Sequence, residues 1–199
     1  MTPRVKLWTN DDASAWRDAL ARYDEVVAAQ NVKVLAERDR WYREELPSLI
    51  HGRKEPHVTV AELALATEWK MARGVWRAPN LLRVKGNDPA LVISTSASAL
   101  AQIPHATKPI VALAELDGVG PATASSIAAA AAPEHYPFFD ELVAEQIPAL
   151  GAVAWTMSYY TKYADAIRAR ALALGHKFTP ADVAQALWSN SGGKAKYVQ

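Results

Sequence analysis

Residues 116–140 read LDGVGPATASSIAAAAAPEHYPFFD, and the fold prediction for this chain starts from this stretch. Its opening LDGVGP contains two glycines, which tolerate positive φ and close backbone approach, and then a proline, which suits the first position of a helix. The apolar residues 109–116 are typical of an incoming helix, so we expect a tight turn between two helices. The outgoing helix begins at Pro121, and its first amides, which lack intrahelical partners, can hold an anion such as phosphate.

This stretch resembles the helix-hairpin-helix motif, in which a turn of the form Leu-Pro-Gly-Val-Gly joins two helices. The amides of that turn bind one DNA phosphate from the minor-groove side. The resemblance covers about residues 109–131, and it implies that the backbone amides of Gly118, Gly120 and Thr123 contact DNA. Asp117 replaces the usual proline, which places a negative charge near the expected phosphate.

The same resemblance implies a monovalent cation at the turn. In several proteins with this motif, backbone carbonyls bind Na⁺ or K⁺, and the corresponding carbonyls here are those of Ala114, Leu116 and Val119. The chain has no cysteine, so it lacks the ligands of the iron–sulfur cluster found in some relatives. We therefore expect no cofactor other than a structural cation.

Asp140 makes the predicted function more specific. It lies 20 residues after Gly120 and directly follows the apolar run at 136–139. Helix-hairpin-helix (HhH-GPD) DNA glycosylases have an essential aspartate at this distance, so the chain resembles that superfamily over about residues 59–175, as a divergent member. The resemblance implies an all-α fold with two helical lobes around a cleft, and a role for Asp140 in removing a damaged base during base excision repair.

A carboxylate suits that reaction, because it can stabilise an oxocarbenium-like sugar or activate water. Asp140 is also a good N-cap for a helix that begins at Glu141, and the sequence allows either role or both. In family members that also cut the DNA backbone, a lysine two residues after the second glycine forms a Schiff base. Ala122 occupies that position here. We therefore expect a monofunctional glycosylase that leaves the abasic site uncut.

A basic and aromatic segment at residues 68–88 is a second candidate for DNA contact. Arg73 and Arg77 are predicted to meet phosphates, and Trp69 and Trp76 to line a pocket for an extruded base. Further pocket candidates that accompany Asp140 in the sequence are Phe139, Trp155 and Tyr159. The alternative is that these aromatic side chains belong to the core, which is the usual place of tryptophan.

The composition is that of a globular protein. The 199 residues are 50% hydrophobic and 22% charged, with a net charge of +1, and we expect them to form a single unit over residues 1–199. Such a low net charge argues against a protein that coats DNA non-specifically. No signal peptide or run of eighteen apolar residues is present. We expect an intracellular monomer that binds double-stranded DNA and no membrane, and that would be nuclear in a eukaryote.

Helix signals occur along the rest of the chain. Spaced apolar residues predict one helix through 16–27 and another over about 32–46. Thr59 with Glu62 forms a capping box that opens a further helix, and Thr179-Pro180 starts the last one. Residues 189–199 are predicted to be a flexible polar tail.

Three functional hypotheses follow. The first is a monofunctional DNA glycosylase, a hydrolase that uses Asp140. The second is a non-catalytic nucleic-acid-binding protein on the same scaffold, which the low net charge, Asp117 and Ala122 would suit. The third is a helical interaction protein in which the hairpin only joins two helices.

Overall fold

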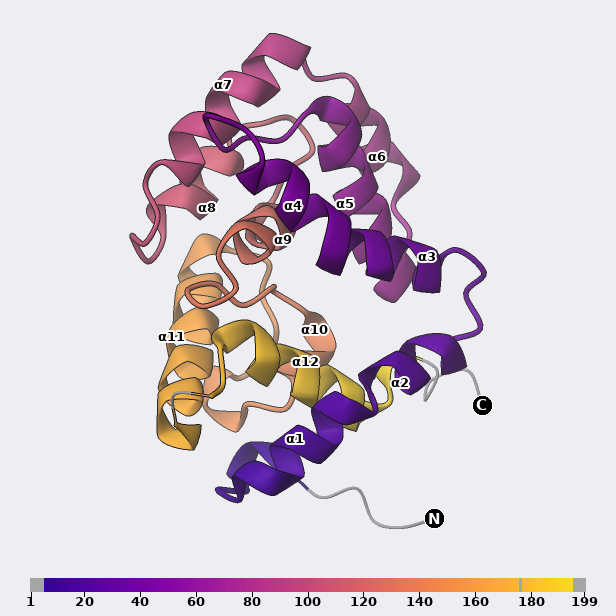
Figure 1. Ribbon diagram of the computed structural model, residues 1–199, viewed down its shortest axis with the longest axis vertical. Helices are drawn as coiled ribbons and strands as arrows, with labels where there is room; N and C mark the ends of the chain where they lie inside the picture. Colours follow the sequence, from indigo (N-terminus) through magenta and orange to yellow (C-terminus); the bar gives the residue numbers. More distant parts are fainter. Residues whose placement is uncertain (1–5, 176, 195–199) are drawn as a thin grey trace.

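The structure is a computed structural model, and it describes residues 6–175 and 177–194. Across those residues all regular secondary structure is helical (Figure 1), which confirms the all-α prediction. The α-helices are α1 Ala13–Ala21, α2 Tyr23–Ala29, α3 Leu35–Arg40, α4 Leu46–His51, α5 Val60–Arg73, α6 Ala78–Lys85, α7 Pro89–Leu100, α8 Lys108–Leu113, α9 Pro121–Ala131, α10 Glu141–Ala144, α11 Met157–Leu174 and α12 Pro180–Ser191. Short 3₁₀ turns occur at η1 Leu7–Thr9 and η3 Pro148–Leu150, and a π-helical turn at η2 Trp41–Glu45.

Side-chain caps begin several of these helices. The capping box of Thr59 and Glu62 forms at α5, and Thr179 with Asp182 forms a second one at α12. Asp140 is the N-cap of α10 and accepts a hydrogen bond from the amide of Leu142 at 2.9 Å. Each cap satisfies amides that the first helical turn leaves unpaired. The predicted starts of these helices are therefore confirmed.

Three predicted helices have different boundaries in the structure. The helix predicted through 16–27 is divided at Arg22, whose ψ of 0° is not helical. The helix predicted over 32–46 begins later, at Leu35, and continues through η2 into α4. In the tail, α12 extends to Ser191, which is buried, so residues 189–191 are helical rather than part of a flexible tail. Residues 195–199 of that predicted tail lie outside the described part of the chain.

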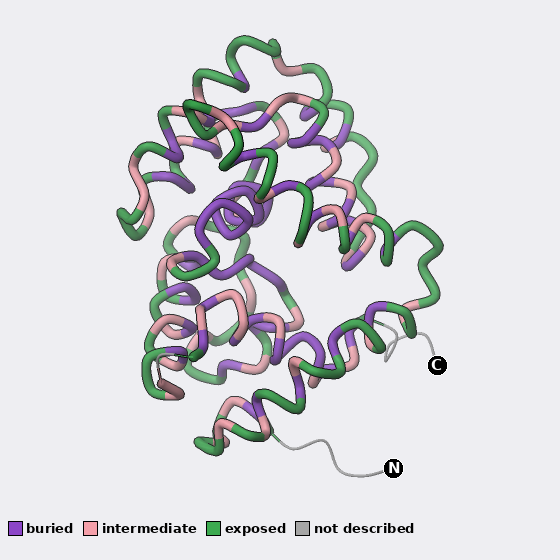
Figure 2. The backbone as a smooth tube through the Cα atoms, viewed as in Figure 1, coloured by how far each residue is buried: buried purple, intermediate pink, exposed green. Residues whose placement is uncertain are grey.

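Helix α9 is the centre of the molecule. Ten consecutive residues of it, 122–131, are buried, and Figure 2 shows this helix as the buried coil between the two ends of the molecule. Its side chains are mostly alanine and serine, which allow the neighbouring helices α4, α5, α8 and α11 to approach closely. In Figure 1, α4 to α8 lie on one side of α9, and α1, α2, α11 and α12 lie on the other. Helix α9 therefore lies between two groups of helices that are distant in the sequence.

Candidate functional site

A cleft of about 470 Å³ lies beside Asp140. Its walls come from the end of α5 and the loop after it, the start of α9, and the segment that leads into α10. Residues that line it include Lys70, Arg73, Arg77, Asn80, Gly120, Thr123, Phe139, Asp140, Glu141, Trp155 and Lys194. The second glycine of the turn and the aspartate 20 residues later thus line the same cavity. This is the juxtaposition that the sequence predicts.

The backbone before Asp140 is held from two sides. The amide of Phe139 donates to Ser125 Oγ of α9 at 3.0 Å, and Tyr163 of α11 donates its hydroxyl to the carbonyl of Phe138 at 2.7 Å. Both contacts are buried. Hydrogen bonds in such places hold a chain in one geometry, because an unpaired buried group is costly. The position of Asp140 is therefore set by α9 and α11.

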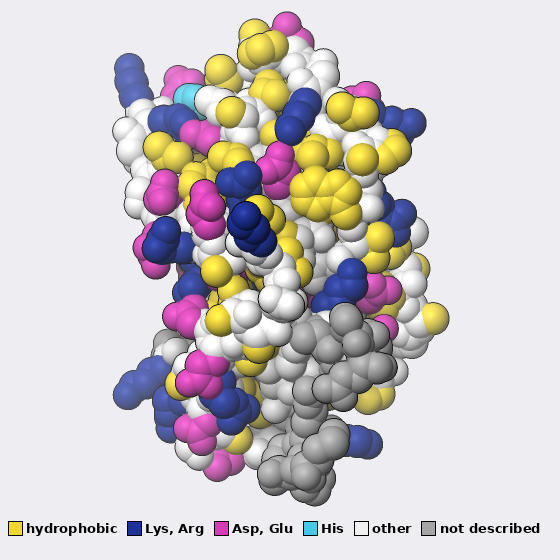
Figure 3. Space-filling view, turned by 90° about the vertical axis from the view of Figure 1, so that its right-hand side faces the viewer, with side chains coloured by type: hydrophobic (Ala, Val, Ile, Leu, Met, Phe, Trp, Pro, Cys, Tyr) yellow, Lys and Arg dark blue, Asp and Glu magenta, His cyan; other side chains and the backbone are white. Residues whose placement is uncertain are grey.

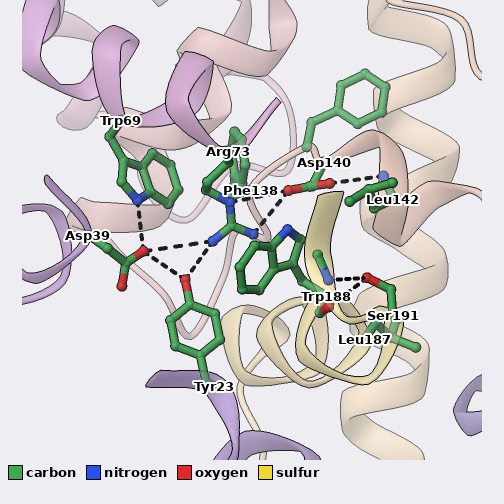
Figure 4. Close-up of polar contacts among 12 residues, drawn as sticks. Tyr23, Asp39, Trp69, Arg73, Phe138, Asp140, Leu142, Leu187, Trp188 and Ser191 are labelled. Carbon is green, nitrogen blue, oxygen red and sulfur yellow. Dashed lines mark hydrogen bonds and ion pairs between the residues drawn. The ribbon is translucent and has the colours of Figure 1, made fainter. Parts of the chain in front are cut away.

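The Asp140 carboxylate forms a buried ion pair with Arg73 (Figure 4). Arg73 Nη2 and Nε donate to Asp140 Oδ2 at 3.0 and 3.3 Å, while Oδ1 accepts the amide of Leu142. Each carboxylate oxygen is therefore a hydrogen-bond acceptor already. If Asp140 accepted a proton from water, that proton would compete with the hydrogen bonds from Arg73 and Leu142. If Asp140 only stabilised a positive charge in the cleft, those hydrogen bonds could remain.

Arg73 contacts several other buried residues besides Asp140. Its Nη1 donates to the hydroxyl of Tyr23 at 2.5 Å and lies 3.9 Å from Asp39 Oδ1. The guanidinium carbon lies 4.2 Å from the ring centre of Trp188 and 4.9 Å from that of Trp69. Burial opposes the charge, but Tyr23, Asp140 and Asp39 outweigh it and raise the pKa of Arg73. Arg73 therefore stays a cation, held between two carboxylates and aromatic faces.

This buried network around Arg73 contains two of the predicted site residues, Arg73 and Trp69. Arg73 lines the cleft but is only 5% exposed, and its guanidinium is paired with Asp140 inside the protein. Trp69 is 2% exposed, stacks on Tyr42 and donates Nε1 to Asp39 at 2.8 Å. It does not line the cleft beside Thr123 but borders a second cavity, of about 570 Å³, which Asp140 also lines, so its role as a pocket residue stays a prediction. Helix α5 packs against α3, α6 and α9, and this packing on several sides buries both side chains.

The other aromatic candidates divide into three groups. Trp155 lines the cleft and is 47% exposed. Phe139 also lines it, but is buried beneath Trp155 and Tyr159 with ring centres 4.9 and 5.6 Å away. Tyr159 is buried and stacks on Phe139 without lining the cleft, and Trp76 is 53% exposed but does not line the cleft either. Trp155 over Phe139 is thus the aromatic surface that a ligand would meet.

The two glycines of the turn have different environments. Gly118 has a φ of +74°, and a Cβ there would lie 2.7 Å from the carbonyl oxygen of Asn80 and 2.9 Å from the amide nitrogen of Val84. The Cα of the first glycine therefore packs against α6. Gly120 is exposed, lines the cleft, and would place a Cβ in open space. Only the second glycine, with Thr123, borders the cavity.

We expect Gly118→Ala to destabilise the protein by about 2–4 kcal/mol, because it adds a left-handed backbone penalty to a steric clash. Gly120→Ala is the matched control, with an expected loss under about 1 kcal/mol, since it places no atom against another. Urea unfolding of both variants measures the difference. Equal losses would contradict the packing of Gly118 against α6.

The rest of the turn is held by Asn87. Its side chain accepts the amide of Asp117 and donates to the carbonyl of the same residue, both at 2.9 Å. The carbonyl of Leu116 accepts the amide of Val119 at 3.1 Å. That carbonyl, one of the three expected to bind Na⁺ or K⁺, thus already has one donor. Cation binding by Ala114, Leu116 and Val119 stays a prediction.

Two basic residues of the cleft, Lys70 and Lys194, were not among the expected site residues, although Lys70 belongs to the basic and aromatic segment at 68–88. Lys70 lies one turn before Arg73 on α5, and Lys194 lies beyond the last helix and donates Nζ to the carbonyl of Gly74 at 2.5 Å. Arg77 also lines the cleft and is exposed, as its predicted phosphate contact requires. The spacing of Lys70 and Arg73, three residues apart on a helix, is the signal that could have placed Lys70 near Asp140 once that ion pair was known.

No family model, curated protein or solved structure matches this chain. Residues 6–175 and 177–194 contain no group of three or more histidine, cysteine, aspartate or glutamate side chains placed to hold a metal ion. Nor does any helix in that part of the chain have the length and apolar character needed to cross a membrane.

Proposed function

We propose that this protein is a DNA glycosylase that docks on duplex DNA through α8, the turn at 114–120 and α9, used as a helix-hairpin-helix. In this proposal the helices on either side of α9 are two lobes, and a damaged base enters the cleft between them. The observation that supports it best is that Gly120, Thr123 and Asp140 line one cavity. A phosphate at the start of α9 would hold the strand while its sugar lies beside the carboxylate.

The chemistry of the cleft suits cleavage of an N-glycosidic bond. Loss of the base leaves positive charge on the sugar, and Asp140, fixed by Arg73 and by Leu142, would oppose that charge without moving. Trp155 and Phe139 offer an apolar surface for a base. The cavity volume of about 470 Å³ is within the ordinary range of small-molecule sites.

The surface charge is compatible with a few local phosphate contacts. On the face drawn in Figure 3, and outside the residues in grey, basic, acidic and apolar side chains are mixed rather than gathered into a basic surface. Docking would then depend on the α9 amides, Arg77 and Lys194, all of which border the cleft. We expect salt-sensitive binding of moderate affinity.

The test is a screen of the purified protein against duplexes that contain alkylated, deaminated or oxidised bases. Alkali is added afterwards so that every abasic site becomes a strand break. We expect breaks on at least one lesion, and none on the undamaged duplex. The absence of breaks on every duplex would overturn the glycosylase proposal.

The second candidate is a nucleic-acid-binding protein without catalysis. The observation that favours it is that both oxygens of Asp140 are already engaged, one by Arg73 and one by Leu142. Salt-sensitive duplex binding that continues without any base release, and that is unaffected in Asp140→Asn, would support this function instead.

A further inference from the structure

Lys70 is the feature of the cleft that glycosidic cleavage does not use. It lies one helical turn before Arg73 on α5, and it lines the same cavity as Asp140. Within residues 6–175 and 177–194 its amine makes no hydrogen bond or ion pair. The other lysines nearby are engaged, since Lys194 donates to the carbonyl of Gly74 and Lys85 pairs with Glu68 at 3.0 Å.

The environment of Lys70 favours the neutral, nucleophilic form of its amine. Burial, with a smaller contribution from the charge of Arg77, lowers the pKa of Lys70 from 10.5 to about 8. A larger share of the Lys70 amines is then neutral near pH 8 than for an ordinary exposed lysine, which is almost fully protonated there. A neutral amine in a cleft reacts with carbonyl carbons to form an imine.

The electrophile follows from the proposed function, on which this inference rests. Removal of a base leaves a deoxyribose whose ring-opened form is an aldehyde at C1′, in the cavity that Lys70 lines. We propose that Lys70 forms an imine with this aldehyde and cuts the DNA strand on the 3′ side of the abasic sugar. In relatives that cut the strand, the imine-forming lysine lies two residues after the second glycine, where this chain has Ala122. Lys70 of α5, which lines the cleft, would take the place of that lysine.

The bond changes balance without a further reactant except water. The lone pair of Nζ attacks C1′, a C–N bond forms, and the carbonyl oxygen leaves as water with the two amine protons. A further proton from solvent water then gives the protonated imine. Water in the open cleft then takes the C2′ proton. The electrons of the C2′–H bond form a double bond between C2′ and C3′, and the C3′–O bond breaks with the phosphate as leaving group. Hydrolysis of the imine releases Lys70.

The experiment uses a duplex in which a separate uracil-removing enzyme has already made the abasic site, so it does not depend on base removal by this protein. Sodium borohydride reduces an imine to a stable amine and thereby links protein to DNA. We expect a covalent complex with the unchanged protein, and the linked peptide should contain Lys70. The complex should fall at least tenfold in Lys70→Met and in Lys70→Arg, and persist in Lys85→Met.

Thermal unfolding shows whether the variants fold, and Lys70→Met should be no less stable, because burial disfavours the charged amine. An unchanged yield in Lys70→Met, linkage at another amine, or no complex with the unchanged protein would overturn the proposal. If no complex is trapped but base release is observed, the glycosylase proposal holds and the imine proposal fails. If a complex is trapped but no base is released, Lys70 forms the imine and the glycosylase proposal fails.

Discussion

Arg73→Met is expected to lower the free energy of unfolding by about 3–5 kcal/mol, the usual result of removing one partner from a buried ion pair. Methionine has a similar length and keeps the contacts with the rings of Trp69 and Trp188, so the loss reports mainly on charge. Without the guanidinium, Asp140 loses its ion pair, and Asp39 loses one of its two arginine neighbours. An uncompensated buried carboxylate is the dominant cost.

Urea unfolding measures this loss, with Arg77→Met as the matched control. Arg77 lines the same cleft but is exposed and forms no ion pair within residues 6–175 and 177–194, so we expect a change within about 0.5 kcal/mol. A loss below about 1 kcal/mol in Arg73→Met would show that the network does not hold the fold together as described.

Asp140→Asn is expected to reduce base release on the order of 10²–10⁴-fold, the range usual for a positioned acid–base or charged group. Asparagine removes the negative charge that would oppose the developing sugar cation. It remains a good helix N-cap and can still accept the amide of Leu142. Arg73 retains Tyr23 and Asp39 as neighbours, so the variant should fold, with a loss of about 1–3 kcal/mol.

Single-turnover base release and duplex binding are measured together on this variant. Asp88→Asn is the matched control, because Asp88 is also a helix N-cap, at α7, and does not line the cleft. We expect the control to keep full activity, and Asp140→Asn to keep duplex binding. If a folded Asp140→Asn variant still releases the base, Asp140 has no role in catalysis and acts only as the N-cap of α10 and the partner of Arg73.

The sequence by itself determined the all-α class and where several helices begin. Those features depend on contacts within one turn of helix, such as the capping box of Thr59 with Glu62 and the N-cap at Asp140. The placement of Gly120 and Asp140 in one cavity was expected only from the resemblance to the helix-hairpin-helix glycosylases, because the 19 residues between them, 11 of which form α9, do not by themselves bring the two together. Three predicted helices had wrong boundaries, at Arg22, at Leu35 and at Ser191, where contacts with other helices compete with the local pattern.

Only the tertiary structure decided what the charged and aromatic side chains do. Arg73 pairs with Asp140 across 67 residues of sequence, so nothing local indicates that this arginine is buried and Arg77 exposed. The same long-range packing stacks Trp69 on Tyr42 and packs Gly118 closely against α6. It also leaves Lys70 in the cleft without a partner in the described residues. Whether a side chain is buried depends on which faces of helices that are distant in the sequence pack together. Hydrophobic periodicity predicts the apolar face of one helix, but it does not predict which helix packs against that face.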